Sequence, residues 1–241
     1  MKRFVVLSDI HGNLEALNQA LEMIRSLNVE AIICLGDIVG YGPDPAECCE
    51  MARKHFFRNL MGNHDAAVVH KISIQYFNPS ARTALLWTEK QLSPPHKAFL
   101  SSLPYTFQTE NLLFVHGTPN SPERFYYLLW DVDLREAFHA FSQWICFVGH
   151  SHRAGIYVLS EEETLEEYPR CELHPSKRYI INVGSIGQPR DGDPRSAFAL
   201  VDLNEKIVEI FRISYPIELV QKKMREKGLP PNLIHRLALG M

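Results

Sequence analysis

Six short apolar runs in this chain lead directly into polar segments in which aspartate, histidine or asparagine stands near glycine. Such apolar runs are typical of buried strands, and in open α/β sheets ligands bind beyond the carboxyl ends of the strands. Glycine lets the backbone turn sharply and approach a ligand closely. The pattern therefore predicts that the six segments meet at one cleft. They are Asp9-Ile10-His11, Gly36-Asp37, Gly62-Asn63-His64-Asp65, His116-Gly117, Gly149-His150-Ser151-His152 and Asn182-Val183-Gly184-Ser185.

The first two thirds of the chain alternate these runs with stretches of helical periodicity. Asn13 is a suitable N-cap for a helix, and Asp44-Pro45 is a typical start of another. Strands that are joined through helices pair in parallel, with the helices on the face of the sheet. The predicted strands are 4–7, 31–35, 56–61, 112–115 and 145–148, and further helices are predicted over 78–91, 94–100 and 131–141.

The last third of the chain is richer in strands. The glutamates between residues 161 and 167 predict a solvated loop, and Pro230-Pro231 predicts a terminal tail. No repeat or linker interrupts the pattern, so a single domain, 1–241, with two sheets is the simplest interpretation for this length. The predicted elements are strands 157–159, 179–181, 197–203 and 206–213, a hairpin turn at 203–205 and a helix over 217–227.

Composition excludes several classes of protein. Hydrophobic residues make up 46% and charged residues 22%, as in soluble globular proteins. The net charge of -3 does not favour nucleic acid as a partner, because proteins that bind it carry a basic surface. No apolar run is long enough for a secretion signal or a membrane span. Five cysteines without a C-x-x-C pair predict a reducing, cytoplasmic setting, while the oligomeric state stays open.

The polar segments offer imidazoles, carboxylates and one amide, with no thiolate. Mixed nitrogen and oxygen ligands suit Mn, Fe, Co, Ni or Zn better than Ca or Mg. On an extended segment alternate side chains point the same way, so Asp9 with His11, like the two histidines 150 and 152, can ligate from one side. Seven candidates predict two ions that share a carboxylate, since nearby cations repel one another without an anion between them. These candidates are Asp9, His11, Asp37, Asn63, His116, His150 and His152.

The motif order D-x-H, G-D, G-N-H-D, a lone histidine and G-H-x-H resembles that of the calcineurin-like metallophosphoesterases. All five blocks occur in order between Asp9 and His152. The segments 36–43 and 187–195 also resemble a bacterial and archaeal branch of small phosphodiesterase-like proteins, often compared with YfcE, and the likeness covers nearly the whole chain. Ser151 stands where threonine is common in the family, at a position whose side chain is not a ligand.

The resemblance implies a four-layer α/β/β/α sandwich of two mixed β-sheets flanked by helices. It also implies two divalent transition-metal ions, Mn2+ in the first place and Fe, Zn, Ni or Co as alternatives, with a metal-bridging hydroxide that attacks phosphorus. His64, oriented by Asp65, would stabilise charge on the phosphoryl group or protonate the leaving oxygen. One ion would be held by Asp9, His11 and His152, the other by Asn63, His116 and His150, with Asp37 as the bridge.

Substrate-binding residues are less sharply indicated. Arg190 can bind a phosphate through its planar guanidinium or stand exposed on its loop. Asn182 and Ser185 are candidates for substrate contact, with the shaping of a loop as the alternative. Substrate choice is expected in the loops around 70–80, 118–130 and 186–195. The aromatic run 125–127 predicts either an interface or a wall for base stacking.

The favoured function is a phosphodiesterase or nucleotide phosphohydrolase that acts on a small phosphoester or nucleotide. Hydrolysis of diadenosine tetraphosphate is a specific alternative, since some proteins of the resembled fold cleave dinucleoside polyphosphates. A nuclease is a second alternative, although those usually carry extra DNA-binding regions, and this chain is short and mildly acidic. The third is a non-catalytic scaffold, which would not need the complete ligand set that this chain retains.

Overall fold

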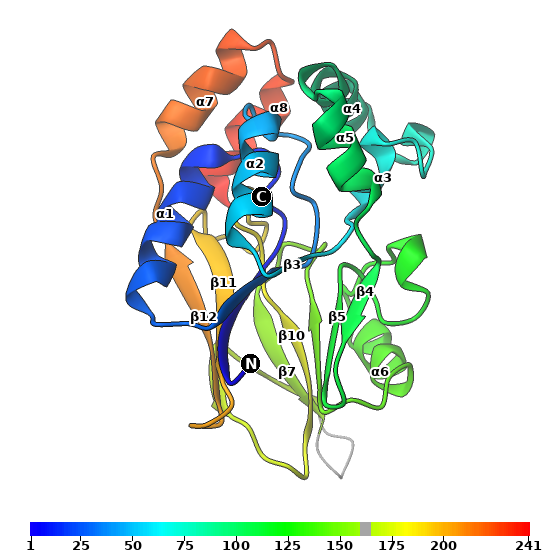
Figure 1. The fold of residues 1–241 in the computed structure, drawn as a ribbon, viewed down its shortest axis with the longest axis vertical. Coiled ribbons are helices and arrows are strands. Elements are labelled where there is room, and N and C mark those ends of the chain that lie inside the picture. Colours follow the sequence, from blue (N-terminus) through cyan, green and yellow to red (C-terminus); the bar gives the residue numbers. More distant parts are fainter. Residues whose placement is uncertain (160–164) are drawn as a thin grey trace.

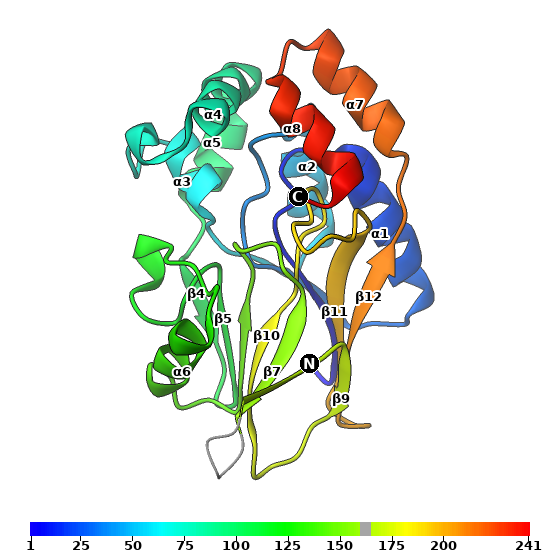
Figure 2. The same ribbon diagram turned by 180° about the vertical axis from the view of Figure 1, so that it is seen from behind.

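The computed structural model describes residues 1–159 and 165–241 and consists of two β-sheets with helices on their outer faces (Figures 1 and 2). The strands are β1 (Arg3–Leu7), β2 (Ala31–Cys34), β3 (Arg58–Asn59), β4 (Thr106–Gln108), β5 (Leu112–Val115), β6 (Ile145–Val148), β7 (Gly155–Leu159), β8 (Leu165–Tyr168), β9 (Arg170–Glu172), β10 (Arg178–Asn182), β11 (Ser196–Asp202) and β12 (Ile207–Ile213). The α-helices are α1 (Leu14–Ser26), α2 (Pro45–His55), α3 (Asn63–Val68), α4 (Pro79–Gln91), α5 (Pro94–Ser101), α6 (Asp131–His139), α7 (Ile217–Glu226) and α8 (Pro231–Arg236). Short 3-10 turns lie at η1 (Ile74–Tyr76), η2 (Pro122–Arg124) and η3 (Leu237–Leu239).

Both sheets are mixed. The first sheet has the strand order β3-β2-β1-β11-β12-β9, and the second has the order β4-β5-β6-β10-β7-β8. Strands β1, β2 and β3 run parallel, and so do β5, β6 and β10, while the remaining pairs are antiparallel. The parallel strands therefore end at the same edge of each sheet, as the strand–helix–strand order predicts.

Strand β1 illustrates how the layers form. Phe4 and Val6 face the core between the sheets, where the Phe4 ring packs edge-on against Phe114 of the second sheet with centroids 6.2 Å apart. Val5 and Leu7 point the other way, into the core shared with α1 and α2. A third core lies between α6 and the outer face of the second sheet (Figure 2). The order helix, sheet, sheet, helix confirms the predicted α/β/β/α sandwich.

Capping side chains begin several helices where the sequence predicts them. Asn13 accepts a hydrogen bond from the Ala16 N–H at α1 (3.1 Å), and Asn78 accepts from the Ala81 N–H at α4 (3.0 Å). Asp44 precedes α2, but its side chain makes no cap bond. The buried carboxylate pairs instead with Lys223 of α7 and with Lys227. This contact ties the C-terminal helices to α2.

Several elements differ from the sequence-based expectation. The predicted third strand shortens to Arg58–Asn59, because residues 60–62 lead into the loop before α3, a helix that was not predicted. Of the predicted acidic loop, residues 161–164 lie outside the described part, whereas Leu165–Tyr168 form β8, which pairs with β7. The predicted tail contains α8, whose Leu233 and Ile234 are buried. Among the described residues, no helix is long and apolar enough to cross a membrane.

Candidate metal centre

All six polar segments lie at the carboxyl edge of the two sheets. The main chain joins them, since His11 N–H donates to the Asp37 carbonyl (2.9 Å) and Gly149 N–H donates to the His116 carbonyl (2.9 Å). Gly187 N–H donates to the Asp9 carbonyl (2.9 Å), which ties the loop after β10 to the end of β1. Side chains from both sheets thus gather at one place inside the molecule.

A first group contains Asp9, His11 and His152, all fully or nearly fully buried. Asp9 Oδ1 lies 3.7 Å from His11 Nε2 and 3.2 Å from His152 Nε2, and the two Nε2 atoms are 3.1 Å apart. Nδ1 of His11 donates to the Val39 carbonyl (3.2 Å), and Nδ1 of His152 donates to the Gln188 carbonyl (2.5 Å). A neutral ring that donates through Nδ1 carries a lone pair on Nε2, so three acceptor atoms face one another. This arrangement fits a cation.

A second group contains Asp37, His116 and His150, with Asn63 beside them. His116 Nε2 lies 3.4 Å from Asp37 Oδ2, 3.3 Å from Asn63 Oδ1 and 3.2 Å from His150 Nδ1. Nε2 of His150 is buried and has no hydrogen-bond partner in the part of the chain that the structure describes. Oxygen and nitrogen ligands are again combined without sulfur, which suits a divalent transition metal.

Asp37 lies between the two groups. Its Oδ2 is 3.6 Å from Nε2 of His11 in the first group and 3.4 Å from Nε2 of His116 in the second. Its Oδ1 accepts a hydrogen bond from the backbone N–H of His64 (2.8 Å), which fixes the orientation of the carboxylate. Asp37 therefore adjoins both groups, and together with His11 and His64 it also forms a third, overlapping cluster among the described residues.

Burial and neighbouring charges set the titration of these groups. Burial lowers the pKa of His11 and His150 well below the usual value, and burial and Arg190 lower the pKa of His152. Burial alone would also lower the pKa of His116, but Asp37 and Asp9 raise it to about 9. The two buried carboxylates thus favour positive charge at this place.

The backbone is strained at most of the ligand candidates. Asp9, His11, Asp37, His150 and His152 all have positive φ, between 51° and 63°. Non-glycine residues rarely adopt this left-handed conformation, which costs roughly 1–2 kcal/mol each. The cost is sustained because the chain must turn immediately after each strand to point these side chains at one another.

Two glycines permit close contacts around the carboxylates. A Cβ on Gly62 would lie 2.0 Å from Asp37 Oδ1, and one on Gly149 would lie 2.7 Å from Asp9 Oδ2. No side chain fits at either position without displacing a carboxylate of the site. The glycines of the G-N-H-D and G-H-x-H motifs are therefore required by packing.

His64 lines the site, but its predicted relation to Asp65 is wrong. Both oxygens of Asp65 accept backbone N–H groups, from Val39 (3.2 Å) and Gly62 (3.1 Å), so the carboxylate caps α3 and does not contact the imidazole. The His64 ring packs instead between the rings of Tyr41, 4.4 Å away, and Phe77, 5.0 Å away. Burial lowers its pKa to about 4.

Asn182 and Ser185 prove to hold loops in place, which corrects their prediction as substrate-binding residues. The Asn182 amide donates to Ser151 Oγ (2.7 Å) and its oxygen accepts from the Gly184 N–H (3.1 Å). Ser185 Oγ is fully buried and donates to the Asp9 carbonyl (2.8 Å). Their polar atoms are engaged by the loops that carry the ligand candidates, so neither side chain is free to meet a substrate.

Arg190, which the sequence suggests as a phosphate contact, lies beside the ligand candidates. Its guanidinium lies over Tyr41, 5.6 Å from the ring centroid, and donates to Gln188 Oε1 (2.9 Å). Its Nε is buried without a partner, and no carboxylate pairs with Arg190 in the described chain. An unpaired guanidinium beside the metal candidates is suited to an anionic oxygen.

Three further residues lie at the site: Tyr127, which the sequence analysis named only as part of the aromatic run 125–127, and Gln188 and Arg236, which it did not single out. Tyr127 stacks on His150 with centroids 3.8 Å apart and ring planes at 17°. The main-chain carbonyl of Gln188 accepts a hydrogen bond from His152. Any residue type can make such a main-chain contact, so the sequence does not reveal it. Arg236 of α8 lies near Arg190, which together with burial lowers its pKa. Arg236 belongs to no motif, so only the folded chain reveals its place.

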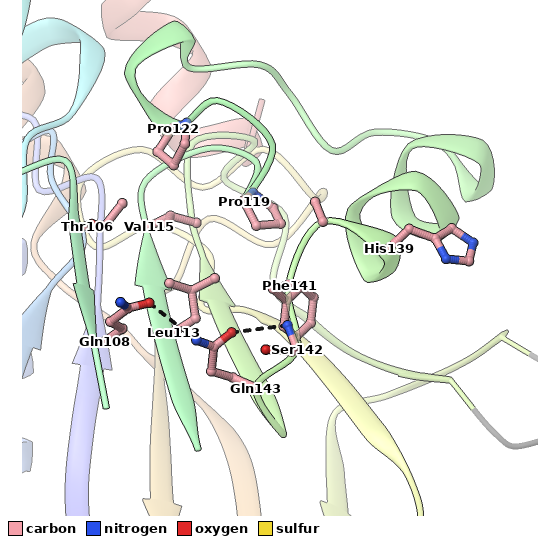
Figure 3. Close-up of a pocket in the computed structure, with 11 residues that line it drawn as sticks. Thr106, Gln108, Leu113, Val115, Pro119, Pro122, His139, Phe141, Ser142 and Gln143 are labelled. Atoms are coloured by element: carbon pink, nitrogen blue, oxygen red, sulfur yellow. Dashed lines mark hydrogen bonds between the residues drawn. The ribbon is translucent and has the colours of Figure 1, made fainter. Parts of the chain in front are cut away.

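Two hollows lie near these loops. One of about 780 Å³ has Asn63, His64 and His150 in its wall and so opens on the metal candidates. The other, of about 540 Å³, lies between β4, β5 and the end of α6 (Figure 3). The second holds a hydrogen-bonded pair of amides, Gln143 donating to Gln108 (3.3 Å), and its single titratable lining residue, His139, points away from them. The first hollow is therefore the one associated with the chemistry.

Comparison with known proteins agrees with this geometry. Residues 1–206 match the calcineurin-like phosphoesterase superfamily domain. The chain is 40% identical over 240 residues to the uncharacterized protein MJ0912 of Methanocaldococcus jannaschii, covering 98% of this chain and 97% of the relative. It is 38% identical to a metallophosphoesterase from Sphaerobacter thermophilus of known structure, with a TM-score of 0.86 and 99% of both chains covered. The E. coli phosphoesterase Yfce is also among the similar structures, at a TM-score of 0.43, 18% identity and coverage of 88% of this chain and 100% of Yfce.

The family and the site lead to one conclusion. A family model matches most of the chain, and two relatives of nearly equal length exceed 30% identity. Buried clusters of histidine and aspartate occupy the carboxyl edge of the sheets, as a dinuclear metal site requires. The chain belongs to the calcineurin-like phosphoesterase superfamily, whose members are metal-dependent phosphoester hydrolases.

Proposed function

We propose that this protein is a phosphodiesterase or nucleotide phosphohydrolase that uses two divalent transition-metal ions, with Mn2+ as the first candidate. The observation that supports it most strongly is the set of overlapping buried histidine and aspartate clusters, in which Asp37 lies 3.6 Å from His11 and 3.4 Å from His116. Acceptor atoms at 3.1–3.9 Å from one another, many of them with no donor between them, require positive charge. Hydrolysis of diadenosine tetraphosphate is the specific alternative within this class.

The proposed ligand assignment follows the two groups. Asp9, His11 and His152 hold one ion, and Asn63, His116 and His150 hold the other, with Asp37 shared. When bound, the two ions polarise the phosphoryl oxygens and lower the pKa of water at the site.

The chain's own residues position the phosphoryl group. Arg190 directs its unpaired guanidinium nitrogen at the site and binds a phosphoryl oxygen there. His64, held between two aromatic rings, contacts the leaving oxygen and donates a hydrogen bond to it. The main-chain carbonyls of Val39 and Gln188 keep two imidazoles in the orientation that the assignment needs.

We also propose that residues 1–241 act as one domain in the cytoplasm. The two sheets share a continuous apolar core, and both contribute residues to the site, so neither forms it alone. All five cysteines are free thiols, and four of them are buried, which fits a reducing compartment. The mildly acidic charge again argues for a small phosphoester or nucleotide as substrate in place of nucleic acid.

The test is hydrolysis of bis-p-nitrophenyl phosphate and p-nitrophenyl phosphate by Mn-loaded wild type and Asp37→Ala. We expect diester hydrolysis in the wild type and a loss of about 1,000-fold in kcat/KM in the variant, because several kcal/mol of metal-dependent stabilisation disappear. Metal content, measured on the same samples, should fall in parallel.

Two control variants separate charge from general damage. Asp37→Asn keeps the acceptor for the His64 N–H but loses the charge, and should be nearly as inactive as Asp37→Ala. Glu22→Ala removes an exposed carboxylate of α1 and should behave like wild type. Equal activity of wild type and Asp37→Ala would refute the assignment of Asp37.

A further inference from the structure

The hollow that opens on the metal candidates is walled by aromatic rings. We propose that it binds the nucleobase of a nucleotide substrate whose phosphoryl group lies at the metal centre. The inference rests on the proposed function and names the substrate class of the same site.

The hollow is continuous with the reaction site. Asn63 and His150, both candidate ligands, and His64 form part of its wall. A substituent on a phosphorus atom held at the metal centre therefore has this hollow within reach. Its volume of about 780 Å³ lies in the range of pockets that bury a small ligand.

The part of the hollow's wall next to the candidate site consists of aromatic rings that pack on the imidazoles of His64 and His150. Tyr127 stacks on His150 at 3.8 Å, and Tyr41 and Phe77 pack on His64 at 4.4 Å and 5.0 Å. Three aromatic side chains thus extend the surface of the metal centre into the hollow. A flat, neutral ring stacks on such a surface, and every nucleobase presents one.

The outer wall comes from two of the loops in which substrate choice was expected. Tyr76, in η1, is 88% exposed, and Tyr126, after η2, is 49% exposed. Large exposed aromatic side chains from two loops that line the same hollow are typical of a binding site. Arg124 donates to the hydroxyl of Tyr126 (3.1 Å).

The charges in the wall favour a base over a second phosphate or a sugar acid. Besides His64 and His150, the described lining residues include one carboxylate, Glu123, and one guanidinium, Arg124, whose charges have opposite signs. A polyphosphate chain would find no net positive charge here, whereas a nucleobase finds rings together with polar groups at their edge. Arg190 lies over the Tyr41 ring, 5.6 Å from its centroid, is not among the described residues that line the hollow, and stays available to the phosphoryl group.

The test compares adenosine 5′-monophosphate with ribose 5-phosphate, which lacks only the base, in binding to the Mn-loaded protein by titration calorimetry. A stacked base contributes roughly 5- to 150-fold in affinity, so we expect adenosine 5′-monophosphate to bind at least tenfold more tightly. Aryl esters are unsuitable for this comparison, because their own rings would fill the hollow.

Variants at the rim identify the rings as the cause. In Tyr76→Ala combined with Tyr126→Ala, the ratio of the two affinities should fall at least threefold. The matched Tyr76→Phe and Tyr126→Phe pair keeps both rings and should keep the ratio. Phe57→Ala removes an exposed ring next to β3, outside the hollow, and should also leave the ratio as in wild type.

Two results would overturn the inference: equal affinity of wild type for both ligands, or a ratio that survives loss of both rim rings. Either result is distinct from failure of the proposed function. If the proposed function itself failed, wild type would cleave neither bis-p-nitrophenyl phosphate nor p-nitrophenyl phosphate and would bind no metal. Protein that is active and metal-loaded but has no preference for the ligand with a base would refute only the inference about the nucleobase and would leave the proposed function intact.

Discussion

At the scale of single residues, the ligand candidates combine function with conformational cost. Five of the seven adopt left-handed backbone conformations that glycine tolerates far better. Such strain at an active site persists only where the surrounding structure holds it. Here the main-chain bonds between neighbouring strand ends, such as His11 N–H to the Asp37 carbonyl, hold the turns. The side chains of these residues therefore reduce the stability of the metal-free fold.

His11 offers a direct test, because its φ is 51° and its side chain is buried. In metal-free protein, His11→Gly should be more stable to unfolding by urea than His11→Ala by about 1 kcal/mol, since both lose the imidazole but only glycine relieves the backbone. The same pair of substitutions at Leu17, within α1, should show the opposite order. Equal stability of the His11 variants would mean that the backbone is not strained there.

At the scale of elements, the turn between β11 and β12 depends on Asp202. Its Oδ1 accepts the N–H groups of Asn204 (3.0 Å) and Glu205 (3.1 Å), and its other oxygen pairs with Arg3 of β1. Burial would raise the pKa of Asp202, but the Glu205 N–H and Arg3 together bring it below the usual value. The ionised carboxylate therefore stabilises both the turn and the junction of β1 with β11.

The sign of the pH dependence follows from that lowered pKa. The contribution of Asp202 is complete above the pKa of an unfolded aspartate, near 4, and is lost as the pH falls through the lower folded value. Asp202→Asn should thus cost about 1 kcal/mol at pH 7, and the difference should shrink steadily below about pH 4. Urea unfolding at several pH values measures both quantities. A difference that does not change with pH would assign the effect to the shape of the side chain and exclude its charge.

Elements with strong local signals could be predicted from the sequence, and elements stabilised by partners could not. The apolar run of β1, the N-cap Asn13 and the helix start at Asn78-Pro79 are local features and appear as predicted, whereas Asp44 precedes its helix without a cap bond. Strand β4 has exposed ends and exists because it pairs with β5, and β8 exists because it pairs with β7. Such edge strands carry little apolar periodicity of their own.

The same distinction holds for the site. The glycine-flanked histidines and aspartates converge as predicted, because parallel strands end at one edge. The sequence leaves substrate contact and the shaping of a loop both open for Asn182 and Ser185, since one sequence does not show which hydrogen bonds a buried polar side chain makes. The same reason applies to Asp65. Its carboxylate accepts the backbone N–H groups of Val39 and Gly62, and the sequence does not show such main-chain partners.

At the scale of the whole molecule, the candidate metal centre lies where the two sheets meet. Asp9, His11 and Asp37 follow strands of the first sheet, whereas His116, His150 and His152 follow strands of the second. Metal ions bound to these residues would link the two sheets in addition to the apolar core between them. Binding to the folded state alone stabilises it in proportion to the logarithm of metal concentration.

Removal of metal should therefore lower Tm. With Mn2+ at about 100 times its dissociation constant the stabilisation is about 2.7 kcal/mol, which for a chain of this size corresponds to a shift of about 5–10 °C between loaded and chelator-treated protein. Calorimetry with and without a chelator measures the shift, and in Asp37→Ala it should be much smaller. Identical melting of loaded and stripped wild type would contradict a site that spans both sheets.

The pairing of Asp44 with Lys223 and Lys227 has a consequence for how this protein can be shortened. Helix α7 carries Val220 and Met224 against the cavity beside His11, and the two ammonium groups anchor it there. The matched family domain ends at residue 206, so a truncation after β12 looks harmless on a sequence map. Such a cut would remove both counter-charges of the Asp44 carboxylate and would expose to solvent the surface beside His11 that Val220 and Met224 cover. Helices α7 and α8 therefore support the candidate site and should be retained whole in any shortened version of this enzyme.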